Sequence, residues 1–268
     1  MPFSEFQPMS YQTMTLAQEG AVATITLNRP EKRNAISTQM IEDLLAALGE
    51  IESGSALVGI VTGAGKAFCS GMDLEALQAL AGQSPAQNLE DSRRIARMFR
   101  TIWAFPKPLI AAINGPAVAG GTGIATLCDF TLAVPEAKFG YTEVRIGFIP
   151  AIVSVFLIRQ IGEKRARDLL LSGRIIDAKE AHQLGLVNEV VMPAQLMARA
   201  HELAATLIEH SPTGITRTKQ LLRDSAAEQV DRDLERAIAE NVRIRATADF
   251  REGLASFLEK RRPVWSVR

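Results

Sequence analysis

The sequence predicts an α/β fold that carries a helical C-terminal region. Strand-like and helix-like segments alternate through roughly the first two-thirds of the 268 residues, whereas the chain from Pro193 onward is mostly helical, in three stretches separated by turn signals. Hydrophobic residues make up 47% of the chain, which is enough for a substantial core. We therefore expect an α/β core over residues 1–192 and a helical region over residues 193–268.

The first strand-like segment, residues 21–30 (AVATITLNRP), ends in a turn that precedes a helix. Ser37 or Thr38 can cap this helix, whose apolar residues recur at helical spacing to about residue 51. A second strand-like segment, residues 56–65 (ALVGIVTGAG), runs into a glycine-rich loop. The order of strand, helix and strand is typical of an α/β core.

The next helix-like segment, residues 88–105, is periodic until Pro106 and Pro108 stop it. Residues 109–115 (LIAAING) then have the continuous apolar character of a fully buried strand. A second glycine-rich loop follows this strand. The two loops therefore occupy equivalent places, each directly after a buried strand.

Charge and cysteine content exclude several classes of protein. Lys and Arg number 30 against 30 Asp and Glu, so no overall positive field favours nucleic acid or an anionic membrane. Cys69 and Cys128 show no metal-ligand spacing, and so few cysteines suit a reducing compartment. With no secretory signal visible and no apolar run long enough to span a bilayer, we expect a cytoplasmic protein.

The three histidines likewise suggest no metal site, because His182, His201 and His210 lack ligand spacing. Asp129 lies where a strand begins and is expected to be structural.

The glycine-rich loops fit none of the familiar glycine motifs. The GAGK stretch at residues 63–66 lacks phosphate-loop spacing, and GGTGIA at residues 120–125 lacks the third glycine of a dinucleotide fingerprint. Ser70 is not in a nucleophile elbow, since Phe68 stands at the first glycine position of that motif. Each loop instead leads into a probable helix, whose first N–H groups have no partner within the helix. Two such termini facing each other would bind an oxyanion.

Several separated stretches of the sequence resemble the crotonase family, the enoyl-CoA hydratases and isomerases. The similar stretches follow the family's order, cover nearly all the chain from about Thr13, and read LNRPEKRNAIS (27–37), GKAFCSGMDL (65–74), AAINGPAVAGGTGIATLCDF (111–130), AKFGYTEVRIGFIP (137–150), LLLSGRIIDAKEAHQLGLVNEVV (169–191) and FREGLASFLEKRRPVW (250–265). This resemblance implies the family's spiral of β-β-α units. It also implies a homotrimer or a dimer of trimers, with the C-terminal helices packing between subunits.

The resemblance assigns the catalytic groups position by position. The oxyanion hole falls on the backbone N–H groups of Met72 and Gly120, and a catalytic carboxylate falls on Glu143. Hydratases of the family carry a second glutamate where this chain has Gly123. Ala151 replaces a glycine that helps to position the attacking water, while its own N–H could still serve. Together with Gly121, Gly123 and Ala151 are expected to line the substrate pocket.

The resemblance also implies that coenzyme A is part of the substrate and that no separate cofactor is needed. The residues expected to bind it are Lys32, Arg33, Ala35, Ser70, Asp73, Leu74 and Lys260, the last from a neighbouring subunit. A substrate with a second carboxylate would need a cation, for which Arg145 is a candidate. Trp265 lies in a charged end, residues 259–268, that fits a solvated tail or a contact to a ligand or partner.

Three functions remain open at this point. The first is an enoyl-CoA hydratase or dehydratase in acyl-CoA and fatty acid metabolism, acting on a substrate that could be branched. The stretch FGYTEVRIGFIPAIV (139–153) resembles bacterial 3-methylglutaconyl-CoA hydratases and their relatives more than it resembles fatty-acid isomerases. The second is a 3-enoyl-CoA to 2-enoyl-CoA isomerase that works with one glutamate. The third is a non-catalytic protein of the same fold that binds CoA or scaffolds a partner.

Overall fold

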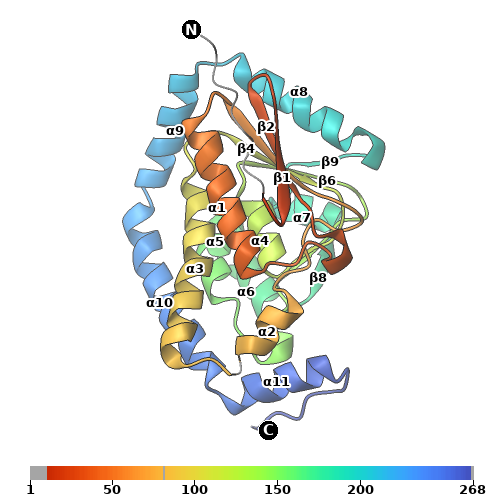
Figure 1. Ribbon diagram of the computed structural model, residues 1–268, viewed down its shortest axis with the longest axis vertical. Helices are drawn as coiled ribbons and strands as arrows, with labels where there is room; N and C mark the ends of the chain where they lie inside the picture. Colours follow the sequence, from red (N-terminus) through yellow and green to blue (C-terminus); the bar gives the residue numbers. More distant parts are fainter. Residues whose placement is uncertain (1–10, 81, 267–268) are drawn as a thin grey trace.

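The computed structural model describes residues 11–80 and 82–266, and its centre is a six-stranded sheet (Figure 1). The strand order is β1 (Met14–Glu19), β2 (Val22–Leu27), β3 (Val58–Gly63), β4 (Leu109–Ile113), β6 (Phe130–Ala133) and β9 (Glu189–Val190). Strands β1 and β2 form an antiparallel hairpin, and every other neighbouring pair is parallel. The hairpin shows that the sheet begins one strand earlier than the sequence pattern indicates.

A smaller sheet lies beside the first and consists of β5 (Ala117–Val118), β7 (Lys138–Gly140) and β8 (Ile175–Asp177). In the chain, β5 follows β4, β7 follows β6, and β8 follows a helix, α6 (Glu163–Ser172). This arrangement of strand, short strand and helix repeats along the chain, in agreement with the predicted spiral of β-β-α units.

The helices surround the main sheet. The helices within residues 1–192 are α1 (Thr38–Ser53), α2 (Leu74–Leu80), α3 (Pro85–Ala104), α4 (Gly120–Leu127), α5 (Ala151–Ile161), α6 (Glu163–Ser172) and α7 (Ala178–Leu184), with 3-10 turns η1 (Pro30–Lys32) and η2 (Glu143–Ile146). Ser37 caps α1 by accepting a hydrogen bond from the Met40 N–H at 3.2 Å, as expected for one of the two proposed caps. Strand β4 is buried at all five positions, which agrees with its unbroken apolar sequence.

The C-terminal region contains four helices in the described residues, so the expected three stretches were one too few. They are α8 (Leu196–Ile208), α9 (Pro212–Asp224), α10 (Ala227–Arg245) and α11 (Ala248–Leu258), and the 3-10 turn η3 (Pro193–Gln195) precedes them. The break between α9 and α10 lies at Ser225 and Ala226, where no glycine or proline marks it in the sequence. A short polar link can end a helix without either residue when tertiary packing redirects the chain.

The apolar stripe of α10 is buried within the same chain. Leu234 and Ile238 pack against α3 and α5, and both are 5% exposed, whereas Val242 is partly buried. Intrachain packing therefore accounts for the stripe, and a role of residues 193–268 in oligomerisation stays a prediction. No helix among the described residues is long and apolar enough to cross a membrane.

Candidate active site

The loop between β2 and α1 is joined to the first glycine-rich loop by a buried asparagine. Asn34 has a left-handed backbone conformation with φ of 52° and no exposed surface. Its Oδ1 accepts from the Arg29 N–H at 2.8 Å, and its Nδ2 donates to the carbonyls of Ala64 and Ala67. All three bonds cross or close a loop, so Asn34 fixes both loops relative to the ends of β2 and β3.

An ion pair reinforces this connection. The Arg29 guanidinium donates to Asp73 Oδ2 at 2.8 Å and to the Ala35 carbonyl. Burial alone would raise the pKa of the Asp73 carboxyl, but hydrogen bonds from Arg29 and from the Glu75 N–H hold that pKa below its usual range. Asp73 therefore holds the start of α2 in place, a role that its expected contact with CoA did not anticipate.

The first glycine-rich loop presents the Met72 N–H. On either side of Met72, the Gly71 carbonyl accepts from the Ile36 N–H at 2.7 Å and the Asp73 N–H donates to the Ile36 carbonyl at 2.8 Å. Because paired residues alternate along a ladder, Met72 directs its own N–H away from Ile36. Within residues 11–80 and 82–266, this N–H has no acceptor.

The second glycine-rich loop presents the Gly120 N–H. Gly120 is the first residue of α4, and the preceding Ala119 has φ of 51°, which is uncommon for a residue with a side chain. The Ala119 N–H donates to Gly140 at 2.7 Å, and the Ala119 carbonyl accepts from the Gly123 N–H. In the described part of the chain the Gly120 N–H donates to no acceptor.

The two loops touch next to these donors. A Cβ atom on Gly71 would lie 3.1 Å from the Ala119 Cβ, and one on Gly121 would overlap the Cys69 carbonyl. The Val118 N–H also donates to the Cys69 carbonyl at 2.9 Å. Since Gly71 precedes Met72 and Ala119 precedes Gly120, the structure brings both N–H groups to one place, where they can stabilise a negatively charged oxygen.

Glu143 begins η2 and carries an unpartnered carboxyl oxygen. Its Oε2 is buried and makes no hydrogen bond within the described residues. Burial raises the pKa of the Glu143 carboxyl from 4.5 to about 7, and only its own backbone N–H opposes the shift. A carboxyl group with such a pKa can both accept and return a proton near neutral pH.

No second carboxyl group can stand at position 123 in this packing. Gly123 lies one turn along α4 from Gly120, and a Cβ atom there would lie 2.7 Å from Phe99 Cε1 and 2.8 Å from Val153 Cγ1. The space where a glutamate side chain would begin is therefore filled by apolar groups from α3 and α5. Ala151, the first residue of α5, is two positions from Val153, so the N-terminus of α5 adjoins this point.

The C-terminal helix α11 packs directly on η2. Cβ atoms on Gly253 and Gly147 would overlap the carbonyl oxygens of Ile146 and Asp249, so the two backbones meet without side chains between them. A small apolar cluster surrounds this contact. It consists of Leu77, Leu80, Phe148, Phe250 and Leu254, and the side chains of Met72, Ile146, Ile244 and Leu258 pack against it. Figure 1 shows α11 crossing the same end of the molecule as α2.

Comparison with known proteins agrees with this geometry. Residues 17–268 match the family model described as enoyl-CoA hydratase/isomerase. The chain belongs to this family. It is 42% identical over 251 residues to a putative enoyl-CoA hydratase of Thermus thermophilus, with 93% of this chain and 99% of that protein covered.

Two further members of the family match nearly the whole length of this chain. A 2,3-dehydroadipyl-CoA hydratase of Escherichia coli is 33% identical, with 95% of this chain and 99% of that protein covered. The crystal structure of an enoyl-CoA hydratase/isomerase from Xanthobacter autotrophicus superposes with a TM-score of 0.86 at 31% identity, with coverage of 94% and 97%. The predicted family and fold are confirmed.

Most of the residues expected to bind CoA in this family member lie together. Lys32 ends η1, Arg33 and Ala35 follow it, and the Ser70 N–H donates to the Arg33 carbonyl at 3.1 Å. Lys32 is exposed and pairs with Glu75 at 2.8 Å.

Two other residues that are expected to bind CoA lie at the surface. Leu74 begins α2 and is 49% exposed, and Lys260 follows α11 with φ of 55°. Arg145 is exposed and lies against Gly173, and its expected contact with a second carboxylate of the substrate stays a prediction.

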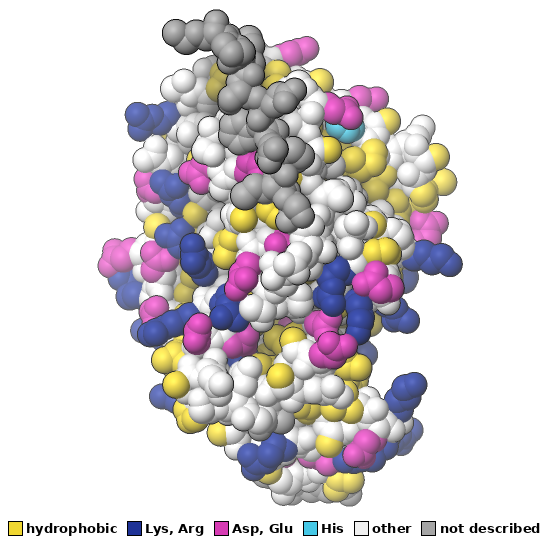
Figure 2. All heavy atoms as spheres, in the orientation of Figure 1, with side chains coloured by type: hydrophobic (Ala, Val, Ile, Leu, Met, Phe, Trp, Pro, Cys, Tyr) yellow, Lys and Arg dark blue, Asp and Glu magenta, His cyan; other side chains and the backbone are white. Residues whose placement is uncertain are grey.

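Surface charge on the family member is mixed, as its neutral composition predicts. Figure 2 shows basic and acidic side chains interspersed over one face. Among the described residues no group of three or more His, Cys, Asp or Glu side chains could hold a metal ion. Asp129 has a structural role, because it accepts from the Leu109 N–H at 2.7 Å and pairs with Lys219.

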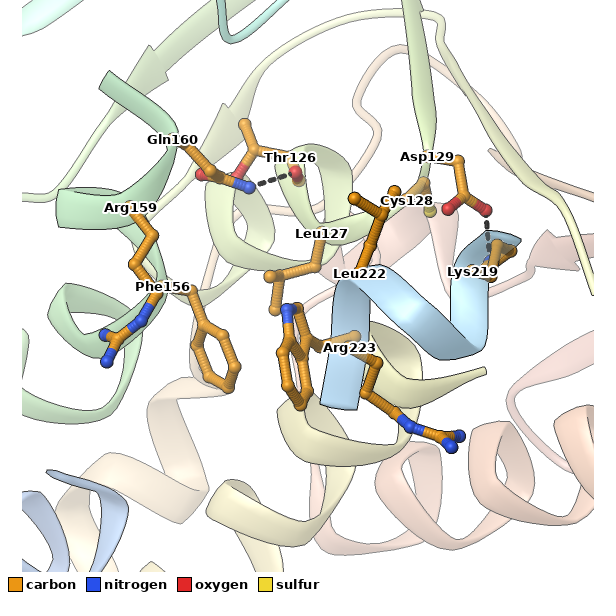
Figure 3. Close-up of a pocket in the computed structure, with 11 residues that line it drawn as sticks. Thr126, Leu127, Cys128, Asp129, Phe156, Arg159, Gln160, Lys219, Leu222 and Arg223 are labelled. Carbon is orange, nitrogen blue, oxygen red and sulfur yellow. Dashed lines mark hydrogen bonds and ion pairs between the residues drawn. The ribbon is translucent and has the colours of Figure 1, made fainter. Parts of the chain in front are cut away.

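A cavity of about 300 Å³ lies near the other end of α4 (Figure 3). It is lined by residues that include Trp103, Cys128, Asp129, Phe156 and Lys219. Its charged groups are paired with each other or with neighbours, and Cys128 is a buried thiol whose pKa is raised to about 12 by burial. The charged side chains that line this cavity are therefore already engaged with one another or with neighbours, in contrast to the N–H group at the N-terminus of α4.

Proposed function

We propose that this protein is an enoyl-CoA hydratase that uses Glu143 as both base and acid. The observation that carries the proposal is the buried, unpartnered Oε2 of Glu143, whose carboxyl pKa is raised to about 7. Such a group costs stability, since a buried polar atom without a partner loses its hydration, and a catalytic role explains why the chain keeps it. A pure scaffold would gain nothing from keeping it, which argues against the non-catalytic alternative.

The free N–H groups of Met72 and Gly120 would bind the thioester carbonyl oxygen of the substrate. When a nucleophile adds at C3 of a 2-enoyl thioester, negative charge moves to that oxygen and forms an enolate. Two fixed backbone donors stabilise this charge without having to reorganise. Ala119 and Gly71, which set the direction of both N–H groups, are therefore positioning residues.

The proton transfers balance with one carboxylate. Ionised Glu143 accepts a proton from water as the water oxygen bonds to C3, and the C2–C3 π electrons pass to the thioester as the enolate forms. Protonated Glu143 then donates that proton to C2, which restores the thioester carbonyl and the ionised carboxylate. One water molecule is consumed, and the reverse sequence eliminates it.

The missing second glutamate requires another contact for the water. The N-terminus of α5 supplies backbone N–H groups next to Val153, which packs on Gly123. We assign this contact to the Ala151 N–H, which has no acceptor within the described residues. Gly121 and Gly123, which were expected to line the substrate pocket, instead face the Cys69 carbonyl and the side chains of Phe99 and Val153, so their missing side chains make room for the protein's own packing.

Coenzyme A would lie along the opening loop. Lys32 and Arg33 lie in the opening loop, which the Ser70 N–H joins to the first glycine-rich loop through the Arg33 carbonyl, with Ala35 in the former loop and Leu74 at the end of the latter. Lys260 would contribute from a neighbouring subunit of a homotrimer or a dimer of trimers, and we propose no cofactor beyond the CoA of the substrate. The resemblance to 3-methylglutaconyl-CoA hydratases supports a branched, carboxylated acyl group.

A 3-enoyl-CoA to 2-enoyl-CoA isomerase is the second candidate, and Gly123 is the observation that favours it. Isomerisation needs no water, so the apolar groups that fill the space at Gly123 would suit it. Glu143 would remove a proton from C2 and return it to C4 while the same two N–H groups hold the dienolate.

The experiment offers crotonyl-CoA, 3-methylglutaconyl-CoA and a 3-enoyl-CoA to the purified protein and separates the products by mass. A product heavier by one water from either conjugated thioester supports the hydratase, and Glu143→Gln should abolish its formation. Conversion of the 3-enoyl substrate alone, without a change in mass, would replace the hydratase by the isomerase. Turnover of the conjugated thioesters that survives in Glu143→Gln would overturn the role of Glu143.

A further inference from the structure

A second group of unpartnered polar atoms lies between α3 and α10. Five buried side-chain atoms in the described part of the chain lack a hydrogen-bond partner, and one of them is Glu143 Oε2. The other four are Gln83 Oε1, Ser92 Oγ, Asn241 Oδ1 and Arg245 Nε. We call these four residues the seam cluster.

The residues of the seam cluster are held near one another by the packing of the two helices. Asn88 joins two of them, since its Oδ1 accepts from Arg245 at 3.0 Å and its Nδ2 donates to the Gln83 carbonyl at 3.4 Å. Helices α3 and α10 run antiparallel, because Asn88 contacts Arg245 while Arg100 pairs with Asp231. Ser92 and Asn241 each lie one turn further along, so they face each other across the same seam.

The seam cluster adjoins the candidate active site on two sides. The Arg245 guanidinium lies 5.7 Å from the centre of the Phe148 ring, and the Phe148 N–H donates to the Glu143 carbonyl. On α3, the buried face that contains Ser92 continues through Ala96 to Phe99, which packs on Gly123. Phe99 and Ser92 are seven positions apart, which corresponds to about 10 Å along the helix axis.

The chemistry of the cluster suits an anion at the end of a chain. Arg245 and Ser92 offer an N–H and an O–H donor, and the amides of Asn241 and Gln83 can turn to present N–H groups. The Arg245 side chain is fully buried, whereas its partner Asp91 is 18% exposed and occupies only Nη2. Burial lowers the pKa of the Arg245 guanidinium, an effect that a further carboxylate would offset. An acyl chain ending in a methyl group would leave all four atoms unpartnered.

We propose that Arg245, Ser92 and Asn241 bind a carboxylate at the far end of the acyl chain, so that the preferred substrate is the enoyl-CoA of a dicarboxylic acid. This inference rests on the proposed function, because it takes the thioester to lie at Met72 and Gly120. A chain extends by about 1.2 Å per bond. Five or six carbons and one hydrogen bond of about 3 Å therefore match the distance along α3.

The test compares two enoyl-CoA thioesters of equal length, 2,3-dehydroadipyl-CoA and 2-hexenoyl-CoA. We expect the wild type to favour the dicarboxylic substrate in kcat/KM by about ten- to a hundred-fold, as a charge-assisted hydrogen bond to a buried arginine provides. Arg245→Met should bring the ratio close to one, mainly through KM. Arg243→Met, an exposed position on the same helix that pairs with Glu240, is the matched control and should keep the wild-type ratio.

Arg245→Met also leaves Asp91 without its partner, so Ser92→Ala provides a milder variant that removes one hydroxyl group. We expect it to lower the ratio several-fold with the melting temperature little changed. An equal rate on both thioesters, or a preference that survives in Arg245→Met and in Ser92→Ala, would mean that the seam holds bridging water only and would overturn the proposal.

Binding of saturated thioesters separates this inference from the proposed function. Adipyl-CoA and hexanoyl-CoA cannot be hydrated, and calorimetry measures their affinities directly. Tighter binding of adipyl-CoA that depends on Arg245, without hydration of any enoyl-CoA, would support the seam cluster and refute the hydratase. Hydration of both enoyl substrates, with equal affinity for the two saturated thioesters, would refute the seam cluster and leave the hydratase intact.

Discussion

Replacing Glu143 by glutamine should make the protein more stable at neutral and alkaline pH. The carboxyl pKa is about 7 in the folded protein against 4.5 for an ordinary glutamate, so the folded state favours the protonated form. At low pH both states are protonated and this group does not affect stability. As the pH rises from about 4.5 to 7, the unfolded chain ionises first, and the folded state loses stability relative to it.

The magnitude follows from the same two values. A difference between 7 and 4.5 corresponds to roughly 3 kcal/mol of unfolding free energy, all of it lost above pH 7. Glutamine cannot ionise, so the unfolding free energy of Glu143→Gln should rise relative to that of the wild type between pH 4.5 and pH 7. Above pH 7 the difference between the two proteins should stay constant.

Urea unfolding of both proteins from pH 4 to pH 9 at one protein concentration measures the difference. Glu136→Gln, at an exposed turn position, is the matched control for removal of one carboxyl group from water. A difference between wild type and Glu143→Gln that stays flat across the series would refute the inference that burial raises the pKa of Glu143.

Three further predictions concern the packing that positions the site. Gly123→Ala should destabilise the protein by about 1–3 kcal/mol and lower kcat, since its Cβ would lie 2.7 Å from Phe99; a melting temperature equal to the wild type would contradict this packing. Arg29→Met should cost about 3–5 kcal/mol in urea unfolding because Asp73 is left buried without its partner, and an unchanged midpoint would count against the ion pair. Gly253→Ala should displace α11 from η2 and lower kcat more than KM, whereas full activity would show that α11 does not position Glu143.

Local signals in the sequence predict much of the fold and of the site. The glycine-rich loops lead into α2 and α4 as expected, because the loop after a buried strand and the helix start are both encoded locally. The choice of Glu143 as the catalytic carboxylate came from resemblance to the family, and its role stays a proposal. The hairpin strand β1 was missed because its sequence, MTLAQE, has only weak alternation.

The residues that the sequence could not identify act through tertiary contacts. Asn34 and Arg29 join two loops, and the only local signal for Asn34 is that asparagine tolerates a left-handed backbone. Arg245 continues the spacing of the buried residues Leu234, Ile238 and Asn241 in α10, but spacing alone does not show what a buried arginine binds. Arg145, two positions after Glu143 in η2, is the expected cation for a second carboxylate of the substrate; its side chain lies against Gly173, and that role stays a prediction.

The most direct test of the account is the pH dependence of kcat/KM for hydration, measured on crotonyl-pantetheine so that CoA phosphates do not titrate in the same range. The account predicts a rise with pH through a single ionisation near pH 7, because hydration needs Glu143 ionised in the free enzyme. A rate that is independent of pH between 5 and 9, or that rises through an ordinary glutamate pKa near 4.5, would contradict the assignment of Glu143 as the one acid and base.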